Sequence, residues 1–419
     1  MPVPADEAHT FTADVAVVGG GIIGLATAWR LTRAGLSTIV IDPSPGTGAS
    51  FAAAGMIAPV SEMSYQHERL FALMRDSASE YPAFVADLED DAQADVDYRE
   101  TETLVCAADP ADRQALADLQ QYQQAAGGVV EALTGRTARR LEPALSPSLS
   151  GVFRSAGDHQ VNPRRITAAL QTVLPTIIRQ MAVELIRAEN GSGLEVTGVR
   201  LDDGRTVTAP VTVLATGVAQ TITLLPRELS LPLRPIRGEV LRTRLPDGAP
   251  PLLERTIRGI VTGRPIYLVP RADGEIVIGA TSCEDNREGP SVEGVAQLLR
   301  DAQRLVPGIG ESELTEVTAR ARPGTHDDAP YLGALPTAEG DTVGGLIVAN
   351  GFYRHGILLT PLASRLAAQL VLHELDPQAV PRPGGSAETA DTDHHHLQTM
   401  DPRRIAHHAA ENQPQGGRP

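Results

Sequence analysis

The pattern of hydrophobic and polar positions predicts a strand, a helix and a second strand near the start of the chain. The run DVAVV, which begins at Asp14, is apolar and β-branched, as in a strand buried on both faces of a parallel sheet. From Ile22 to Leu31 the apolar residues recur at helical spacing, and Gly35 is placed to end the helix. Residues 38–41 then have the composition of a second buried strand.

A glycine-rich turn separates the first strand from the helix, and an acidic residue follows the second strand. Gly19 can form the tight turn, Gly21 lets the backbone approach a pyrophosphate, and Gly24 lets the helix pack close to the strand. The helix N-terminus then offers free amides to the phosphates. Asp42 is placed to bind an adenosine ribose, and its charge disfavours a 2′-phosphate. The segment therefore predicts binding of FAD or NAD rather than NADP, since a turn without a ligand would leave these residues unexplained.

Further along the chain, two different patterns alternate. Helices are predicted over residues 64–88, from about Asp109, over 162–174, and from Ile357 to about Glu374. The buried strand VTVL, which leads into Ala215, Thr216 and Gly217, and the strand LIVAN are typical of the α/β pattern at the start. Between these two strands, PIRGEVLRTR, YLVPR and EIVIGAT read as strands of an antiparallel sheet. A second domain is therefore expected to be inserted into the first.

Length and charge narrow the class of protein. A chain of 419 residues exceeds the size at which a single hydrophobic core usually stops growing, so two lobes are expected. The formal net charge of -16 argues against nucleic acid or an anionic membrane surface as a partner. The sequence contains no lysine, so all 36 basic residues are arginines. Schiff-base chemistry and a lysine general base are thereby excluded, and an anionic substrate is expected to be held by arginine.

The cysteines and the chain ends suggest no further chemistry. The two cysteines have no CxxC spacing, so neither a metal site nor a disulfide framework is predicted. The N-terminus lacks the pattern of a signal peptide, and no apolar run approaches 18 residues, so we expect a cytoplasmic protein. Residues 376–419 contain several histidines but few apolar residues, and we expect a disordered tail without a function there.

Several motifs, taken together and in order, resemble the D-amino-acid oxidase family of flavoproteins, and within it the glycine oxidases of thiamine biosynthesis. The resemblance covers residues 14–374 and is carried by VAVVGGGIIGLA, GASFAAAGMIAP, HQVNPRR, VLATG, LRPIRGEVL, IYLVPRADGEIVIGAT, ARPGTHDDAPYLG and NGFYRHGILLTP. It implies non-covalent FAD as the cofactor. It also implies an α/β fold in which a discontinuous, Rossmann-like FAD-binding domain (residues 11–80, 152–222 and 318–375) joins a substrate-binding domain on a mostly antiparallel sheet (81–151 and 223–317).

The resemblance also implies which residues contact the cofactor. Met56 is expected to lie against the isoalloxazine ring, and the final helix is expected to begin just after Gly356 and to direct its positive end at the flavin. The full set of expected cofactor contacts is Gly19, Gly21, Ile22, Ile23, Gly24, Asp42, Pro43, Ala49, Ser50, Ala54, Gly55, Met56, Thr216, Gly217, Phe352, Tyr353, Arg354, His355, Gly356, Ile357 and Leu358.

For the substrate, the resemblance points to Arg322 as a carboxylate clamp and to Tyr267 as a phenol donor to the same carboxylate. A guanidinium fork can hold a carboxylate through two parallel hydrogen bonds. The alternatives are an ion pair of Arg322 with Asp327 or Asp328, and a tyrosine that is simply packed. Arg354 is expected either to add positive charge near the flavin or to face the substrate.

Three positions depart from the pattern of glycine oxidases. His355 stands where asparagine is usual, and its protonated form would stabilise an anionic reduced flavin; its alternative is a loop histidine bonded to backbone. Ser282 stands where a larger side chain is common, and Ala321 replaces a leucine before the clamp. Together these two positions suggest a pocket roomier than glycine needs.

The implied reaction is the oxidation of glycine to its imine and glyoxylate, with O2 reduced to H2O2. Sarcosine or a small D-amino acid is the near alternative, because one methyl group discriminates by only about 1 to 3 kcal/mol. A quinone-linked dehydrogenase and a non-catalytic flavin-binding redox sensor stay open. The resemblance further implies transfer of the imine to a thiazole synthase, and we expect a homo-oligomer.

Overall fold

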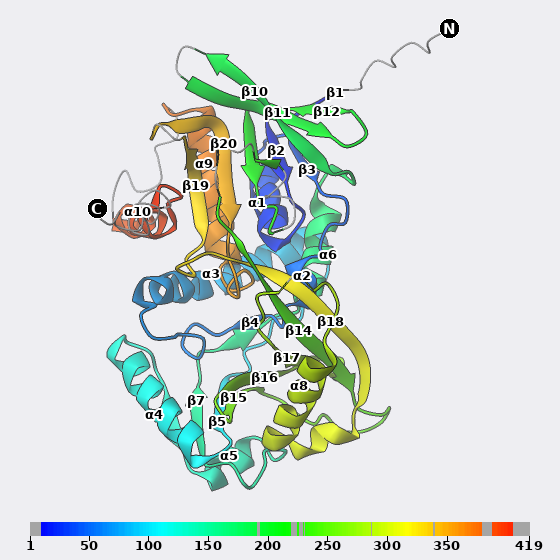
Figure 1. The fold of residues 1–419 in the computed structure, drawn as a ribbon, viewed down its shortest axis with the longest axis vertical. Coiled ribbons are helices and arrows are strands. Elements are labelled where there is room, and N and C mark those ends of the chain that lie inside the picture. Colours follow the sequence, from blue (N-terminus) through cyan, green and yellow to red (C-terminus); the bar gives the residue numbers. More distant parts are fainter. Residues whose placement is uncertain are drawn as a thin grey trace, which may run out of the picture.

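The computed structural model describes residues 10–190, 193–218, 224–225, 229, 231–285, 287–337, 340–378 and 388–404. The described residues form two lobes, each built around one large sheet, and the two sheets lie at opposite ends of the molecule (Figure 1). The fold class expected from the sequence, a Rossmann-like α/β lobe joined to a lobe on a mostly antiparallel sheet, is confirmed.

The first lobe contains a ten-stranded sheet. Its central strands are all parallel and are ordered β20-β13-β2-β3-β9. The strands of this sheet are β1 (Thr10–Thr12), β2 (Val15–Val18), β3 (Thr38–Ile41), β9 (Ile177–Ile178), β10 (Ala182–Asn190), β11 (Gly193–Leu201), β12 (Thr206–Thr208), β13 (Val211–Leu214), β19 (Tyr331–Pro336) and β20 (Thr342–Asn350). As the continuous apolar pattern predicts, all residues of β2, β3 and β13 are buried.

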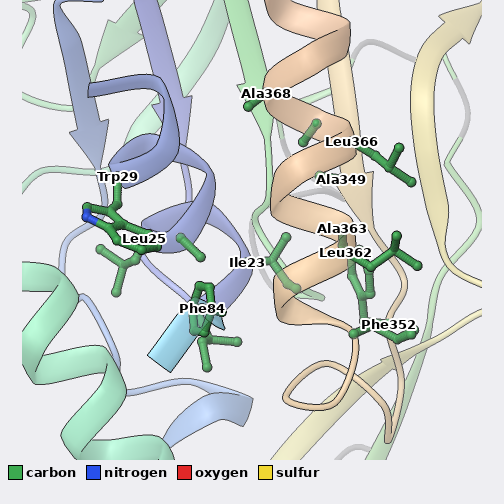
Figure 2. Close-up of a cluster of buried hydrophobic side chains, with 14 of the residues drawn as sticks. Ile23, Leu25, Trp29, Phe84, Ala349, Phe352, Leu362, Ala363, Leu366 and Ala368 are labelled. Carbon is green, nitrogen blue, oxygen red and sulfur yellow. The ribbon is translucent and has the colours of Figure 1, made fainter. Parts of the chain in front are cut away.

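Helices from distant parts of the chain pack against one another in this lobe. They are α1 (Ile22–Arg33), α3 (Glu68–Ala92), α6 (Pro163–Val173) and α9 (Thr360–Leu375). Figure 2 shows the core between α1, α3 and α9, where Trp29 meets Phe84 edge to face at 5.4 Å. Gly24 is required where α1 follows the turn after β2, because a Cβ at that position would overlap the carbonyl oxygen of Gly19. The role expected for Gly24, close packing of the helix on the strand end, agrees with this geometry.

The second lobe contains an eight-stranded sheet with the order β18-β14-β17-β16-β15-β5-β7-β6. Its strands are β5 (Thr103–Ala107), β6 (Glu131–Leu133), β7 (Gly151–Ser155), β14 (Arg234–Arg244), β15 (Thr256–Val261), β16 (Arg264–Pro270), β17 (Glu275–Gly279) and β18 (Glu313–Gly324). All neighbours are antiparallel except β5 and β15. The helices α4 (Pro110–Ala125), α5 (Gly135–Leu141) and α8 (Val292–Leu305) and the 3-10 turn η1 (Pro307–Glu311) belong to this lobe.

Short elements lie between the lobes. The helix α2 (Ala49–Ala52) contacts β18, and β4 (Met56–Ile57) pairs with β8 (His159–Gln160). Three of the expected domain boundaries fall inside single elements: 80/81 in α3, 151/152 in β7 and 317/318 in β18. The helix α3 does not break near residue 80, because its buried positions continue from Leu70 to Leu88. The strand β18 pairs with β14 along its whole length, so residues 318–324 belong to the second sheet.

Two expectations about the C-terminal part are wrong. The helix expected to begin just after Gly356 is α9, and it begins at Thr360. Residues 356–359 instead form successive turns, in which the carbonyls of Ile357 and Leu358 accept hydrogen bonds from α3. Within the expected disordered tail, residues Glu388–Met400 form the helix α10, which lies beside α9 and β19 (Figure 1). Its Met400 is buried and its Asp393 forms a salt bridge of 2.8 Å with Arg365.

Candidate active site

A cavity of 460 Å³ is lined by residues from both lobes. The residues expected at the site that line it are Gly21, Ile22, Ile23, Asp42, Ala49, Ser50, Ala54, Gly55, Met56, Thr216, Gly217, Tyr267, Arg322, Phe352, Tyr353, Arg354, Gly356 and Ile357. Gly19, Gly24, Pro43, His355 and Leu358 are not part of its lining.

One end of the cavity lies at the N-terminus of α1. The backbone is open at Gly21, where a Cβ would meet only the Ser50 hydroxyl, at 3.7 Å. The same hydroxyl accepts a bond of 3.1 Å from the Ile22 amide, which ties α2 to α1. Asp42 accepts bonds of 2.7 Å from the amides of Gly20 and Ser44. Its carboxylate is thereby fixed at the edge of the cavity and keeps lone pairs for a further donor.

Arginines hold the segment between α2 and β4 at the cavity wall. Arg271 is buried and donates a bond of 2.8 Å to the carbonyl of Val161 and another to that of Ala54. Burial lowers the pKa of Arg271 to about 10, so the guanidinium remains charged at neutral pH. Arg164 donates to the carbonyl of Phe51 at 3.0 Å and lies 3.5 Å from the centre of its ring. This role of Arg164 has no sequence signal, since arginines at a polar helix start are typically solvated.

The turn after β20 closes the cavity from the side of the first lobe. Two hydroxyls of α3 hold this turn: Ser77 donates a hydrogen bond of 2.8 Å to the carbonyl of Leu358, and Tyr81 donates one of 2.8 Å to the carbonyl of Ile357. The Tyr353 amide donates to the carbonyl of Pro323 at 2.9 Å, which ties the turn to β18. Arg354 is exposed at this wall, with its guanidinium 2.8 Å from the Tyr353 hydroxyl. Residues that are far apart in the chain therefore meet at one wall of the cavity.

Tyr267 belongs to a row of residues that crosses the second sheet. Across β14, β17 and β16, Val240 pairs with Gly279, and Gly279 pairs with Tyr267. Residues paired in this way project from the same face of a sheet. Gly279 leaves the space that the phenol ring fills, because a Cβ there would overlap the Tyr267 hydroxyl. Burial raises the pKa of Tyr267, so the phenol is a neutral donor at neutral pH.

Arg322 extends over Gly238 into the same cavity. A Cβ at residue 238 would overlap the guanidinium, so only glycine leaves room for this arrangement. Arg322 donates to the carbonyl of Thr281 at 3.3 Å, and among the described residues no carboxylate lies within 4.0 Å of it. The alternative of an ion pair with Asp327 or Asp328 is wrong. Their carboxylates instead lie near other side chains, with Arg404 at 3.0 Å from Asp327 and with His67 and Arg234 at 3.9 Å from Asp328.

A charged group near Tyr267 was not expected from the sequence. Glu62 and Arg258 line the cavity and form a salt bridge of 2.6 Å, and His355 lies behind them with Nδ1 3.2 Å from Glu62. Burial raises the pKa of Glu62. Arg258 and His355 lower this pKa by more than burial raises it, so that it is about 2. Glu62 is thus a carboxylate at neutral pH. Its position at the end of the run GASFAAAGMIAPVSE was the one available signal, whereas nothing around Arg258 distinguishes it from a solvated strand residue.

The structure also limits other kinds of site. In the described ranges, no three His, Cys, Asp or Glu side chains are arranged to bind a metal ion. None of the helices described here is both long enough and apolar enough to cross a membrane. The candidate site is the cavity lined by the open turn at Gly21 and by the guanidinium of Arg322, because a concave pocket with converging polar groups is the usual place for a ligand.

This fold and this cavity define an FAD-dependent oxidoreductase, and the chain belongs to the family described as FAD dependent oxidoreductase, whose model matches residues 14–370. It is 33% identical to a glycine oxidase of Geobacillus kaustophilus over 372 residues, which cover 86% of this chain and 93% of that protein. The crystal structure of glycine oxidase from the same organism matches with a TM-score of 0.76 and 31% identity, over 89% of this chain and 99% of that one. A bifunctional ThiO/ThiG protein of Trichormus variabilis is 32% identical over 87% of this chain, which spans only 53% of that relative.

FAD is the cofactor of this family, and the residues present fit it. The backbone is open at Gly21, and a Cβ at Gly48 or Gly217 would meet no atom within 4 Å, so a long ligand can lie against the main chain there. Asp42 provides an acceptor at this end, and apolar atoms of Met56 and Ile357 line the cavity further along. A polar pyrophosphate end and a more apolar ring end are what a flavin dinucleotide needs.

Proposed function

We propose that the protein catalyses the oxidative deamination of glycine, with O2 as the final electron acceptor. The observation that carries this proposal is the guanidinium of Arg322, which has no carboxylate partner among the described residues and lies with the Tyr267 phenol in the cavity that begins at the dinucleotide turn. Arg322 is half-buried and its guanidinium lies at the cavity wall, where it can pair with a carboxylate through two hydrogen bonds, so an anionic ligand is the expected partner. A glycine oxidase of 33% identity supports an amino acid carboxylate as that ligand.

In the proposed complex, Asp42 binds the adenosine ribose of non-covalent FAD, and the amides after Gly21 bind its pyrophosphate. The segments Ala49–Met56 and Phe352–Leu358, together with Thr216 and Gly217, hold the flavin end. Arg354, which is exposed at this wall, adds positive charge beside the ring. Gly19, Gly24 and Pro43 act through the shape of the backbone, since they do not line the cavity.

When bound, FAD accepts a hydride from the α-carbon of the substrate and passes the two electrons to O2, which gives H2O2. Arg322 holds the substrate carboxylate through two parallel hydrogen bonds, and Tyr267 donates a third. With the carboxylate fixed, the α-carbon is oriented toward the ring beside Met56. The neutral amine becomes an imine, and water hydrolyses the imine to glyoxylate and ammonia. No acid or base on the protein is required for the C–H step.

The size of the substrate is a finer part of the proposal. Glycine leads because two glycine oxidases, of Geobacillus kaustophilus and Bacillus licheniformis, are at least 30% identical to this chain. Ser282 is small and exposed at the cavity, so sarcosine or a small D-amino acid is the second candidate. A methyl group that fits such a space changes the binding free energy by only about 1 to 3 kcal/mol.

The partners are also proposed. The ThiO/ThiG relatives join a region similar to this chain to a further region in one polypeptide, and a ThiG-type thiazole synthase is the proposed recipient of the imine. We further propose that the protein acts in the cytoplasm as a homo-oligomer.

The test is an anaerobic titration of the yellow holoprotein with glycine, sarcosine, D-alanine and D-proline, each added separately. Loss of the flavin absorbance with glycine at the lowest concentration is the expected result, and reoxidation by air with release of H2O2 identifies O2 as the acceptor. Bleaching followed by slow reoxidation in air would instead indicate a quinone-linked dehydrogenase. If none of the four bleaches the flavin, the oxidase proposal fails and a redox sensor becomes the better explanation.

A further inference from the structure

The cavity contains two acidic side chains, and they lie at opposite ends of it. Asp42 is tied to the amides of Gly20 and Ser44 beside the dinucleotide turn. Glu62 is bonded to Arg258 at 2.6 Å, next to Tyr267. Among the described residues that line the cavity, Glu62 is therefore the one carboxylate at the substrate end.

Glu62 lies close enough to the proposed substrate clamp to act on the same molecule. Arg258 pairs with Tyr267 across β15 and β16, so the two side chains project from the same face of the sheet. The charges of Arg322 and Glu62 both act on the Tyr267 hydroxyl, the former lowering and the latter raising its pKa. The phenol thus lies between the Glu62 carboxylate and the Arg322 guanidinium, for which the described part of the chain offers no carboxylate.

An α-amino acid carries its two polar groups on one carbon atom, and Arg322 and Tyr267 satisfy only the carboxylate. We propose that Glu62 binds the amino group of the substrate, so that the zwitterion is held at both ends across Tyr267. This inference rests on the proposed function and adds the group that distinguishes an amino acid from other carboxylates. Without such an acceptor, the cavity would bind acetate or glycolate as readily as glycine.

Glu62 has the capacity to make this contact. One carboxylate oxygen accepts from Arg258, and the other lies 3.2 Å from the Nδ1 of His355. A carboxylate has about four lone-pair sites, so two remain for the N–H groups of an amine. The side chain is 8% exposed, which means that the contact would be made in a largely dry site, where it is strong.

The contact also has a consequence for protonation. Glu62, with a pKa of about 2, does not accept a proton from the amine, so it is a positioning residue and not a base. Its negative charge favours the ammonium form of the bound substrate, whereas the reaction uses the neutral amine. The groups that face Glu62 are Arg258, His355, Asp158 and Tyr267, and the positive charge of Arg258 partly offsets this effect.

Glu62→Gln tests the proposal, because it keeps the size of the side chain and removes the charge. The Kd of glycine, measured from the concentration dependence of anaerobic flavin reduction, should rise by about 10- to 100-fold, as expected for loss of one charged hydrogen bond. The Kd of acetate, measured from its perturbation of the flavin spectrum, should stay within about threefold. The rate of flavin reduction at saturating glycine should reach its plateau at a lower pH than in the wild type, because the bound ammonium loses its counter-charge.

Asp301→Asn is the matched control. Asp301 is a buried acid that forms a salt bridge of 2.8 Å with Arg264, and neither residue lines the cavity. This variant should leave both Kd values and the pH profile unchanged. If Glu62→Gln fails to fold or to retain FAD, the double variant Glu62→Gln/Arg258→Gln removes both charges of the pair, and the same loss of selectivity for glycine over acetate is expected.

An equal change in the Kd of glycine and acetate, or a pH profile identical to that of the wild type, would overturn the role of Glu62 while the oxidase function stands. Failure of the wild type to be reduced by any amino acid would overturn the function itself. The two outcomes are distinguished by the wild-type titration, which is completed before the variants are compared.

Discussion

Arg258 and Tyr267 lie directly opposite each other on the antiparallel strands β15 and β16. The salt bridge from Arg258 to Glu62, a residue 196 positions away in the chain, ties this strand pair to the segment that follows β4. The face of the second sheet is therefore fixed to the first lobe at the point where the substrate is proposed to bind. The predictions below test this site and the fold that supports it.

Replacement of the proposed clamp should impair substrate binding. Arg322→Ala removes a two-pronged charged hydrogen bond, so the glycine concentration for half-maximal flavin reduction should rise by about two to four orders of magnitude. Arg322→Lys, which keeps the charge but not the fork, should give a smaller rise. Stopped-flow reduction under anaerobic conditions measures both. A variant with normal saturation would remove Arg322 from the substrate site.

The space above Gly238 should be as important as the clamp itself. Gly238→Ala places a methyl group where the Arg322 guanidinium lies, so the arginine must move and the KM for glycine should rise by about tenfold or more. Gly157→Ala is the control, because a Cβ there meets no atom within 4 Å. Steady-state kinetics of both variants, with FAD content measured in parallel, check the prediction. Equal KM values in the two variants would contradict it.

A buried acid near Glu62 should make stability depend on pH. Burial raises the pKa of Asp158 to about 7, and one of its oxygens has no hydrogen-bond partner in the described structure. Since this pKa lies above that of an unfolded Asp, the free energy of unfolding falls as the pH rises from about 4 to 7, by about 4 kcal/mol in all from this group. Asp158→Asn should remove this dependence and should raise the Tm above pH 7. Thermal unfolding at pH 4 to 8 measures it, and a parallel pH profile in the variant would count against the assignment.

The helix α10 should contribute to stability, unlike a disordered tail. Met400 is 1% exposed, so Met400→Ala should lower the free energy of unfolding by about 2 to 5 kcal/mol. Gln398→Ala, at an exposed position of the same helix, should have little effect. Denaturant unfolding of both variants measures the difference. If the two midpoints coincide, α10 is not docked in solution.

The elements predicted correctly from the sequence are those with local signals. The unit from β2 to β3 is visible because continuous apolar strands, a 3.6-residue period and a glycine turn follow one another directly. The strands around Tyr267 alternate between apolar and polar residues, and their antiparallel pairing follows from short connections. The sequence also predicted a strand that contains Tyr267, although the space that Gly238 leaves for Arg322 and Gly279 leaves for Tyr267 is visible only in three dimensions.

The parts that were missed depend on distant partners. Glu62 and Arg258 look like ordinary polar residues until the fold brings them together, and Arg164 looks solvated until Phe51 and Glu316 are beside it. The helix α10 has too few apolar residues to be stable alone, but the salt bridge from Asp393 to Arg365 and the bond of 2.9 Å from His396 to Asp76 dock it on α9 and α3. The start of α9 was misplaced because hydroxyl groups on α3 bind the carbonyls of the preceding turn.

The row of paired residues across β14, β17, β16 and β15 lies in the second lobe, so the proposed substrate contacts and the proposed contacts to the dinucleotide are largely carried by different lobes. The proposed cofactor end is built from glycines, backbone amides and Asp42 of the first lobe, whereas the face proposed to meet the substrate is carried by strands of the second. A substitution within that row is expected to act on the proposed substrate face and on the packing of Ala52 and Ala54 against it, while Asp42 and the amides after Gly21 belong to the other lobe. New specificities can therefore arise from a few exchanges on one sheet face, while the inherited redox chemistry is kept.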